Sequence, residues 1–281
     1  MPNSEPIREV AMPLGHVEPH AGLLVAPADG QLIYKIMKVD DLLRSIDGRY
    51  LHFNRVDRYT DFPGADTHDG EQVPKDRLGN AAFKFAGAPN FSAADYYDQS
   101  RRRTYACCFS LENSDFIWAT YGKGSQRGKV GVVFDFAKLR AKLNHTLRPE
   151  NCAVAYNGLC CWPIFSINYG IVEYVDWRAH CENADHLPNP IRYTYLKDKQ
   201  GFQDEKELRI SLSALGIGHF VLRDKAAMEF PPSLHVEFDF RAAIGLGIIR
   251  QILCDSNTDR SLLYTRLAEF GIRPAEGGDP L

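Results

Sequence analysis

The chain has 281 residues, of which 44% are hydrophobic and 25% charged, and its formal net charge at pH 7 is −3. This composition suits a folded protein with a sizeable core, and it gives no global basic field that would draw the chain to nucleic acid or to an anionic membrane. The sequence shows neither the run of about twenty apolar residues that spans a bilayer nor a basic and apolar leader, so we expect a cytoplasmic protein with no membrane partner.

Three regions are predicted from the composition along the chain. Residues 1–30 contain five prolines and no sustained periodicity, which indicates an extended N-terminal arm held by contact with the body. Residues 31–272 carry the periodic segments and are predicted to form a single domain. Residues 273–281 are expected to form a flexible tail.

The first half of this domain alternates short strands and helices. Apolar periodicity predicts, in order, a strand at Gln31–Ile36, a helix at Val39–Asp47, a strand at Arg49–Asn54, a long loop at 57–80, a helix at Ala93–Arg103 and a strand at Thr104–Ser110. Ser114 can cap a helix that carries Trp118 and Tyr121.

The second half is dominated by strands. After a strand at Lys129–Phe136 and a helix at Phe136–Leu143, residues 145–166 are less regular, and further strands are expected at Tyr169–Asp176, Glu205–Ser213, His219–Arg223, Leu234–Phe240 and Ile248–Asp255, with a last helix from near Thr258. Few strand–helix–strand units occur in series. The pattern therefore predicts an α+β fold with a mixed or mostly antiparallel central sheet and flanking helices.

The most informative segment is Gln203–Leu212, with the sequence QDEKELRISL. Read as a strand, it places Leu208, Ile210 and Leu212 on a core-facing side, because side chains alternate along a strand. The other side then carries two carboxylates and a guanidinium, Glu205, Glu207 and Arg209. Such a face is either simply solvated or able to stabilise a positive charge that develops at a sugar carbon.

Two further places carry aromatic or basic side chains in suggestive positions. Tyr34 and Lys35 are neighbours on the first strand, so only one of them can face a given site; the lysine either reaches water or binds an anion. Trp118 and Tyr121 share a helix face, which either packs on the sheet or stacks on a nicotinamide or adenine ring. Neither GxGxxG after a strand nor GxxxxGK[ST] is present.

The cysteines argue against a disulfide framework or a familiar metal site. They number seven, two pairs are adjacent, and no CxxC occurs, so we expect free thiols and no metal. A zinc-dependent hydrolase remains a third hypothesis, with donors from His180, Cys181, His186, Cys152, Cys160 and Cys161. The run Arg101–Arg103 fits a solvated helix end or a phosphate contact. Ser110 lacks the G-x-S-x-G turn of a serine hydrolase.

Seven segments, taken in order, resemble one family. They are LIYKI (32–36), YLHF (50–53), ACCFS (106–110), IWATYG with GKVGVVFDF (117–136), VEYVDW (172–177), EKELRIS (205–211) and IIRQILC (248–254). This order is similar to that of the large, mostly bacterial family known as domain of unknown function twenty-nine seventy-one. Two departures are YTDFPGAD at 59–66, where the family commonly has Phe-Asn-Asp-Pro, and Asn54 in place of a serine.

The layout also resembles, more remotely, the ADP-ribosyltransferase arrangement. That resemblance implies a split sheet and NAD as the substrate. Glu207 would be the catalytic carboxylate and Glu205 its companion. The same resemblance implies cofactor-binding roles for Tyr34 or Lys35 at a ribose or phosphate, for Trp118 and Tyr121 as the nicotinamide wall, and for Ser110 and Arg209.

Two functions follow as hypotheses. The first is an NAD-consuming enzyme, either an ADP-ribosyltransferase or an NAD glycohydrolase. The alternative is a non-catalytic recognition or regulatory module in bacterial conflict systems, such as defence or toxin systems, or in mobile elements. The sequence specifies neither the acceptor, which could be protein or nucleic acid, nor the oligomeric state.

Overall fold

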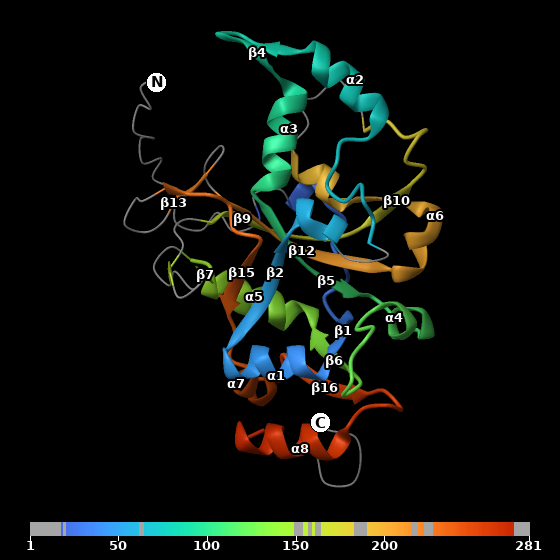
Figure 1. Cartoon of the computed structure of the whole chain (residues 1–281), viewed down its shortest axis with the longest axis vertical. Coiled ribbons are helices and arrows are strands. Elements are labelled where there is room, and N and C mark those ends of the chain that lie inside the picture. The colour runs from blue at the N-terminus through green and yellow to red at the C-terminus, as the bar shows by residue number, and fades with distance from the viewer. Residues whose placement is uncertain are drawn as a thin grey trace.

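The computed structural model describes residues 18, 21–61, 65–148, 154–156, 159–160, 164–182, 190–214, 219–221 and 227–272. Their fold is α+β, built on a ten-stranded sheet in which every strand pair is antiparallel. Helices gather at both ends of this sheet (Figure 1). The predicted fold class, a mostly antiparallel sheet with flanking helices, is confirmed.

The main sheet runs in the order β16-β6-β1-β5-β2-β15-β7-β8, and β12 pairs with both β5 and β9. Its strands are β1 (Leu32–Lys38), β2 (Tyr50–Arg55), β5 (Thr104–Ser110), β6 (Lys129–Asp135), β7 (Val154–Tyr156), β8 (Leu159–Cys160), β9 (Ile164–Ile171), β12 (Glu207–Ala214), β15 (Ser233–Glu237) and β16 (Ile249–Cys254). Three small sheets join β3 (Lys84–Phe85) to β4 (Ala88–Ser92), β10 (Glu173–Val175) to β11 (Leu196–Asp198), and β13 (Phe220–Val221) to β14 (Ala227–Met228).

The helices and 3₁₀ turns connect these strands. They are α1 (Val39–Asp47), α2 (Pro74–Ala82), α3 (Ala93–Arg102), α4 (Asp115–Thr120), α5 (Phe136–Thr146), α6 (Lys199–Phe202), α7 (Phe240–Gly245) and α8 (Arg260–Glu269), with 3₁₀ turns η1 (Ala21–Leu23), η2 (Val56–Asp61), η3 (Pro190–Tyr195) and η4 (Gln203–Glu205). Four of the helices start at an aspartate whose side chain accepts a backbone N–H of the first turn. These N-caps are Asp135, Asp198, Asp239 and Asp259.

One face of the sheet carries the main hydrophobic core. Leu208, Ile210 and Leu212 of β12 are fully buried there. They pack with residues of α1, α5, α7 and α8 in a single cluster. The predicted phase of this strand is therefore confirmed, because its alternate apolar residues all enter the core.

Strand β5 marks a fork in the sheet. Along one edge it pairs with β12 over its whole length. Along the other edge, Ser110 pairs with Tyr34 of β1, whereas Ala106 pairs with Asn54 of β2. In the gap between the two partners, the carbonyl of Cys108 accepts a hydrogen bond of 3.1 Å from Lys35 Nζ. The lysine thus satisfies a carbonyl where the fork opens.

Several predicted elements differ from the structure. The expected loop at 57–80 contains α2, which begins at a proline in the first helical turn. The strand expected at Tyr169–Asp176 is divided between β9 and β10. Phe240 begins α7 instead of ending a strand, because Asp239 caps a helix there.

The expected N-terminal arm is described only at residue 18 and from residue 21 onward, and the expected tail at 273–281 lies outside the described residues. The described part of the arm contacts the body. The Glu18 N–H donates to the carbonyl of Ile167, and Leu24 packs with Ile191 and Tyr195. Within the described ranges, no helix combines the length and apolarity needed to cross a membrane.

Candidate functional site

The second face of the sheet carries polar side chains in register. Tyr34, Ser110 and Glu207 occupy one row across β1, β5 and β12, and Cys108 and Arg209 occupy the next. Glu207 is 2% exposed and Arg209 is fully buried. The hypothesis of a solvated charged face is therefore wrong for these two residues.

Glu205 reaches the same place by another route. It was expected on the strand, but β12 begins at Glu207, and Lys206 lies between them in the left-handed region with φ 46°. The Ser110 hydroxyl donates to the Glu205 carbonyl at 2.8 Å, and the Leu111 N–H donates to the Lys206 carbonyl at 2.8 Å. Ser110 thus positions the turn that carries Glu205.

Two cations bind the paired carboxylates. Lys197 Nζ lies 2.6 Å from Glu205 Oε2 and 3.2 Å from Glu207 Oε2. Arg209 donates from Nε to Glu207 Oε1 at 2.7 Å and from Nη2 to Oε2 at 3.0 Å. Arg209 Nη1 lies 2.8 Å from Asp69 Oδ1. None of these five residues is more than 5% exposed, so the network is buried.

The two glutamates differ in their titration. Burial alone would raise the pKa of Glu207, but the charges of Arg209 and Lys197 outweigh it and hold this pKa well below its usual range. The pKa of Glu205 is raised, first by burial and then by the negative charge of Glu207, against the opposing pull of Lys197. Pairs whose environments separate their pKa values are typical of acid and base roles.

Aromatic side chains surround this network. The Glu207 N–H donates to Tyr174 Oη at 2.8 Å, and the Lys197 ammonium lies 4.8 Å from the centre of the Phe202 ring. The Arg209 guanidinium lies 5.9 Å from the Tyr59 ring centre. Burial and both carboxylates raise the pKa of Tyr121, so its phenol stays protonated and can donate to Glu205.

A loop between η2 and α2 supplies Asp69, and Arg101 of α3 holds that loop. Arg101 donates from Nε to the Asp69 carbonyl at 2.7 Å and from Nη1 to Glu71 at 2.8 Å. Its Nη2 donates to the Thr67 carbonyl at 3.3 Å. Arg101 therefore acts on Glu207 through Asp69 and Arg209, and is neither a solvated helix end nor a free phosphate contact.

The structure separates the two candidates on the first strand. Tyr34 lies in register with Ser110 and Glu207, on the polar face. Lys35 points to the opposite face, where its Nζ lies 5.1 Å from the centre of the Phe109 ring in the core. Alternation along β1 thus places Tyr34, and not Lys35, on the face of the sheet that carries Glu207 and Arg209.

Trp118 packs on the sheet. A Cβ added at Gly131 of β6 would lie 2.9 Å from the indole ring and 2.9 Å from Ile36 of β1, so the glycine makes room for this ring. The indole Nε1 donates to Asn113 Oδ1 at 2.7 Å. The helix face that carries Trp118 covers the polar side of β1 and β6, next to the row that holds Tyr34.

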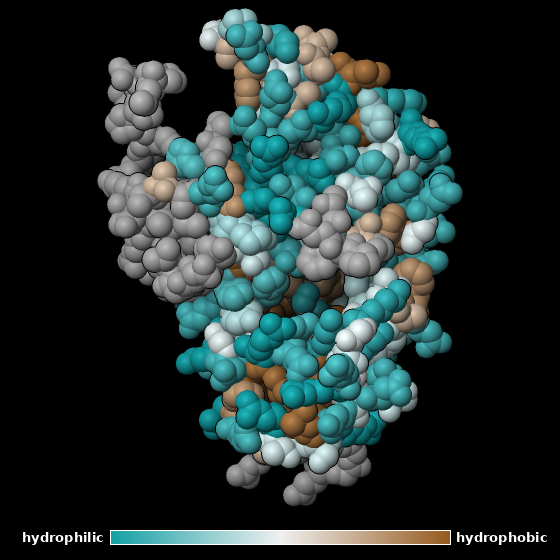
Figure 2. Space-filling view, in the orientation of Figure 1, coloured by the Kyte–Doolittle hydropathy of each residue, from teal (hydrophilic) through white to brown (hydrophobic). Residues whose placement is uncertain are grey.

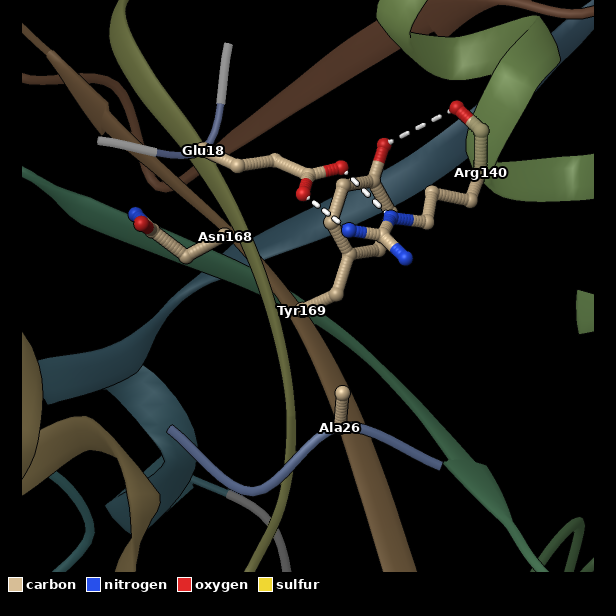
Figure 3. Close-up of a pocket in the computed structure, with 5 residues that line it drawn as sticks. All are labelled: Glu18, Ala26, Arg140, Asn168 and Tyr169. Atoms are coloured by element: carbon tan, nitrogen blue, oxygen red, sulfur yellow. Dashed lines mark hydrogen bonds and ion pairs between the residues drawn. The ribbon is translucent and has the colours of Figure 1, made fainter. Parts of the chain in front are cut away.

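The hollow drawn in Figure 3 lies at the outer edge of β9, away from the carboxylate network. Glu18, Ala26, Arg140, Asn168 and Tyr169 line it. Glu18 and Arg140 face one another across an ion pair, and Tyr169 donates to the Arg140 carbonyl at 3.3 Å (Figure 3). Its cavity volume, about 20 Å³, is far below the usual range for small-molecule sites, so we do not assign NAD to it.

Free thiols are found at the cysteines whose side chains are described, Cys107, Cys108, Cys181 and Cys254. Within the described part of the chain, no group of three histidine, cysteine or carboxylate side chains is placed to hold a metal. Cys152, Cys161 and His186 lie outside the described residues, as does the side chain of Cys160. The hypothesis of a zinc-dependent hydrolase therefore gains no support from these residues.

Sequence reasoning missed Lys197, Asp69, Tyr59 and Tyr174. All four come from segments other than β12, and no local pattern links them to it. Lys197 and Tyr174 pair in register across the small β10–β11 sheet. The local signal at Lys197 is weak, because its segment, 191–197, also contains the polar residues Arg192 and Thr194.

Comparison of the chain with protein-family models, with curated proteins and with solved structures finds no match. The family resemblance described above therefore remains a prediction, and the function has to be argued from the site itself.

Proposed function

We propose that the protein consumes NAD, breaking the bond between nicotinamide and ribose and passing ADP-ribose to water or to an acceptor. One observation carries this proposal. Glu205 and Glu207 converge beside Ser110, at the end of β5 that pairs with β1, and Glu207 is held there as a fixed, ionised carboxylate. A forked sheet with late carboxylates also agrees with the resemblance to ADP-ribosyltransferases.

The chemistry requires such a group. As the carbon–nitrogen bond breaks, its electron pair leaves with the nicotinamide ring nitrogen, and positive charge builds at the anomeric carbon. A carboxylate already held in place stabilises that charge in the transition state without reorganisation. Water or an acceptor then forms the new bond and loses a proton, which Glu205 with its raised pKa can accept.

The charge of the network also suits a cationic ligand. Three carboxylates, Asp69, Glu205 and Glu207, face two cations, Lys197 and Arg209, within the bonded network. The surplus of negative charge favours a positively charged group nearby. The nicotinamide ring of NAD carries such a charge before cleavage. Tyr121, which can donate to Glu205, and Tyr34, which is in register with Glu207, would contact the ribose or the ring.

A second function, the non-catalytic recognition module, is favoured by a different observation. Glu207 is bound by both Lys197 and Arg209, Glu205 is bound by Lys197, and both carboxylates are buried. In a recognition module, such a network would have a structural role alone: it would fix the fold of the binding surface. Activity separates the two functions.

The test is release of free nicotinamide from NAD by the purified full chain, with and without cell extract as a source of acceptor. Glu207→Gln is expected to lower the rate by a factor of about a hundred or more. Asp69→Asn is the matched control, because it also removes a buried partner of Arg209 but leaves both glutamates in place; we expect it to remain within about tenfold of the wild type. A wild type that releases no nicotinamide would favour the recognition module.

A further inference from the structure

The Lys197 ammonium lies between the carboxylates of Glu205 and Glu207. Its ammonium contacts one oxygen of each, at 2.6 Å from Glu205 and 3.2 Å from Glu207. A bound group that pairs with both carboxylates at once would have to be cationic and would have to take this position. The closed network therefore already contains the charge that a ligand would bring.

Lys197 is held differently from Arg209. Arg209 lies on a central strand, is fully buried, and is fixed by Glu207, Asp69 and the Thr194 carbonyl. Lys197 lies on β11, which pairs with β10 and, among the described residues, not with the main sheet. Its side chain has a flexible four-carbon stem, and within the described part of the chain its ammonium contacts the two carboxylates and the Phe202 ring. Of the two cations, Lys197 is the one that can move without disturbing the sheet.

A short exposed turn covers Lys197. Within residues 199–204 all side chains except that of Phe202 are exposed. The turn lies at the outer edge of the molecule, at α6 in Figure 1. Gly201 within it has φ 91°, a conformation that residues with a side chain rarely adopt. Phe202 thus lies against the Lys197 ammonium from an exposed turn that contains a glycine with positive φ.

We propose that Lys197 is an internal cation that blocks the Glu205–Glu207 pair, and that the turn at residues 199–204 covers Lys197 through the Phe202 ring. In the described state the site is autoinhibited. Opening moves Phe202 aside and lets the Lys197 ammonium swing to solvent, which frees Glu205 and leaves Glu207 bound to Arg209 alone, so that the cationic half of NAD can take the place of the ammonium. The identity of the entering ligand rests on the proposed function, whereas the movement of Lys197 does not.

Glycine substitution tests the movement directly. A Cβ added at Gly201 meets nothing within 4 Å, so Gly201→Ala strains only the closed conformation of the turn. Gly87→Ala is the matched control, since Gly87 has φ 83°, equally open surroundings and a place in the β3–β4 turn. The readout is acylation of Lys197 by an N-hydroxysuccinimide ester, followed by peptide mass spectrometry, with exposed Lys123 and Lys206, which lie outside the turn, as internal references.

Gly201→Ala is expected to raise the acylation rate of Lys197 by about fivefold to tenfold relative to the references, because a side chain in this backbone region favours opening by about that factor. Gly87→Ala should leave the rate at the wild-type value. Phe202→Ala, which removes the covering ring, should raise it as well. Equal labelling of Lys197 in Gly201→Ala, Phe202→Ala and wild type overturns the proposal.

Nicotinamide release tests the inhibitory role. In the same variants the rate should rise in parallel with labelling, and Lys197→Met, in which a neutral side chain replaces the ammonium, should exceed the wild type if it remains folded. Faster labelling with no nicotinamide release from any variant supports the movement of Lys197 and refutes the proposed NAD chemistry. Release by the wild type that fails to increase in Gly201→Ala and Phe202→Ala, despite faster labelling, overturns the inhibitory role.

Discussion

Glu207→Gln should be costly to stability as well as to any activity. The wild-type carboxylate accepts two hydrogen bonds from Arg209 and one from Lys197, at 2.7, 3.0 and 3.2 Å, in a site that is 2% exposed. Removing one partner of a buried ion pair costs about 3–5 kcal/mol. Glutamine keeps one acceptor oxygen and nearly the same volume, so we expect a loss of about 3 kcal/mol in the free energy of unfolding.

The assay is urea unfolding of the wild type, Glu207→Gln and the control Glu237→Gln, whose carboxylate is exposed on β15. The control should change the free energy of unfolding by less than about 0.5 kcal/mol. The folded pKa of Glu207 is below its unfolded value, so its stabilisation is complete well above pH 4.3 and is lost as pH falls through the folded pKa. The difference between wild type and Glu207→Gln should therefore shrink below about pH 4. A loss under about 1 kcal/mol at pH 7 would refute the buried network.

Three further predictions concern neighbouring groups. The folded pKa of Glu205 is raised, so its ionisation opposes folding as pH rises through that pKa. Glu205→Gln should therefore lower the free energy of unfolding more at pH 4 than at pH 8. The opposite trend in urea unfolding would contradict the assigned shift. Arg101→Ala removes hydrogen bonds to two carbonyls and a carboxylate and should lower the free energy of unfolding by about 2 kcal/mol. The control, Arg102→Ala at an exposed position, should lower it by less than about 0.5 kcal/mol. Equal free energies of unfolding for the two variants would show that other contacts hold the loop that carries Asp69. Gly131→Ala should displace the Trp118 ring and shift tryptophan emission to longer wavelength, and an unchanged spectrum would show that the ring does not rest on this glycine.

The sequence alone determined the elements whose signals are local. Alternation in β12 predicted the burial of Leu208, Ile210 and Leu212, because a strand presents every second side chain to the same face. The same rule stated that only one of Tyr34 and Lys35 could face the site. Helix α1 was predicted with its observed bounds, Val39–Asp47. Its signals, the apolar spacing and the glycine that follows, lie within a few residues of one another in the sequence.

The tertiary structure alone determined which groups pair with the charged side chains on the polar face of the sheet. Lys197 and Asp69 reach Glu207 from β11 and from the loop before α2, and no spacing in the sequence connects these segments to β12. The left-handed backbone at Lys206 places Glu205 outside the strand. The Ser110 hydroxyl donates to the Glu205 carbonyl and so holds the turn that carries the Glu205 side chain next to the network. A short-range pattern fixes which side of a strand a residue occupies, but the groups that bury and pair its charge are set by chain segments brought together over long distances in sequence.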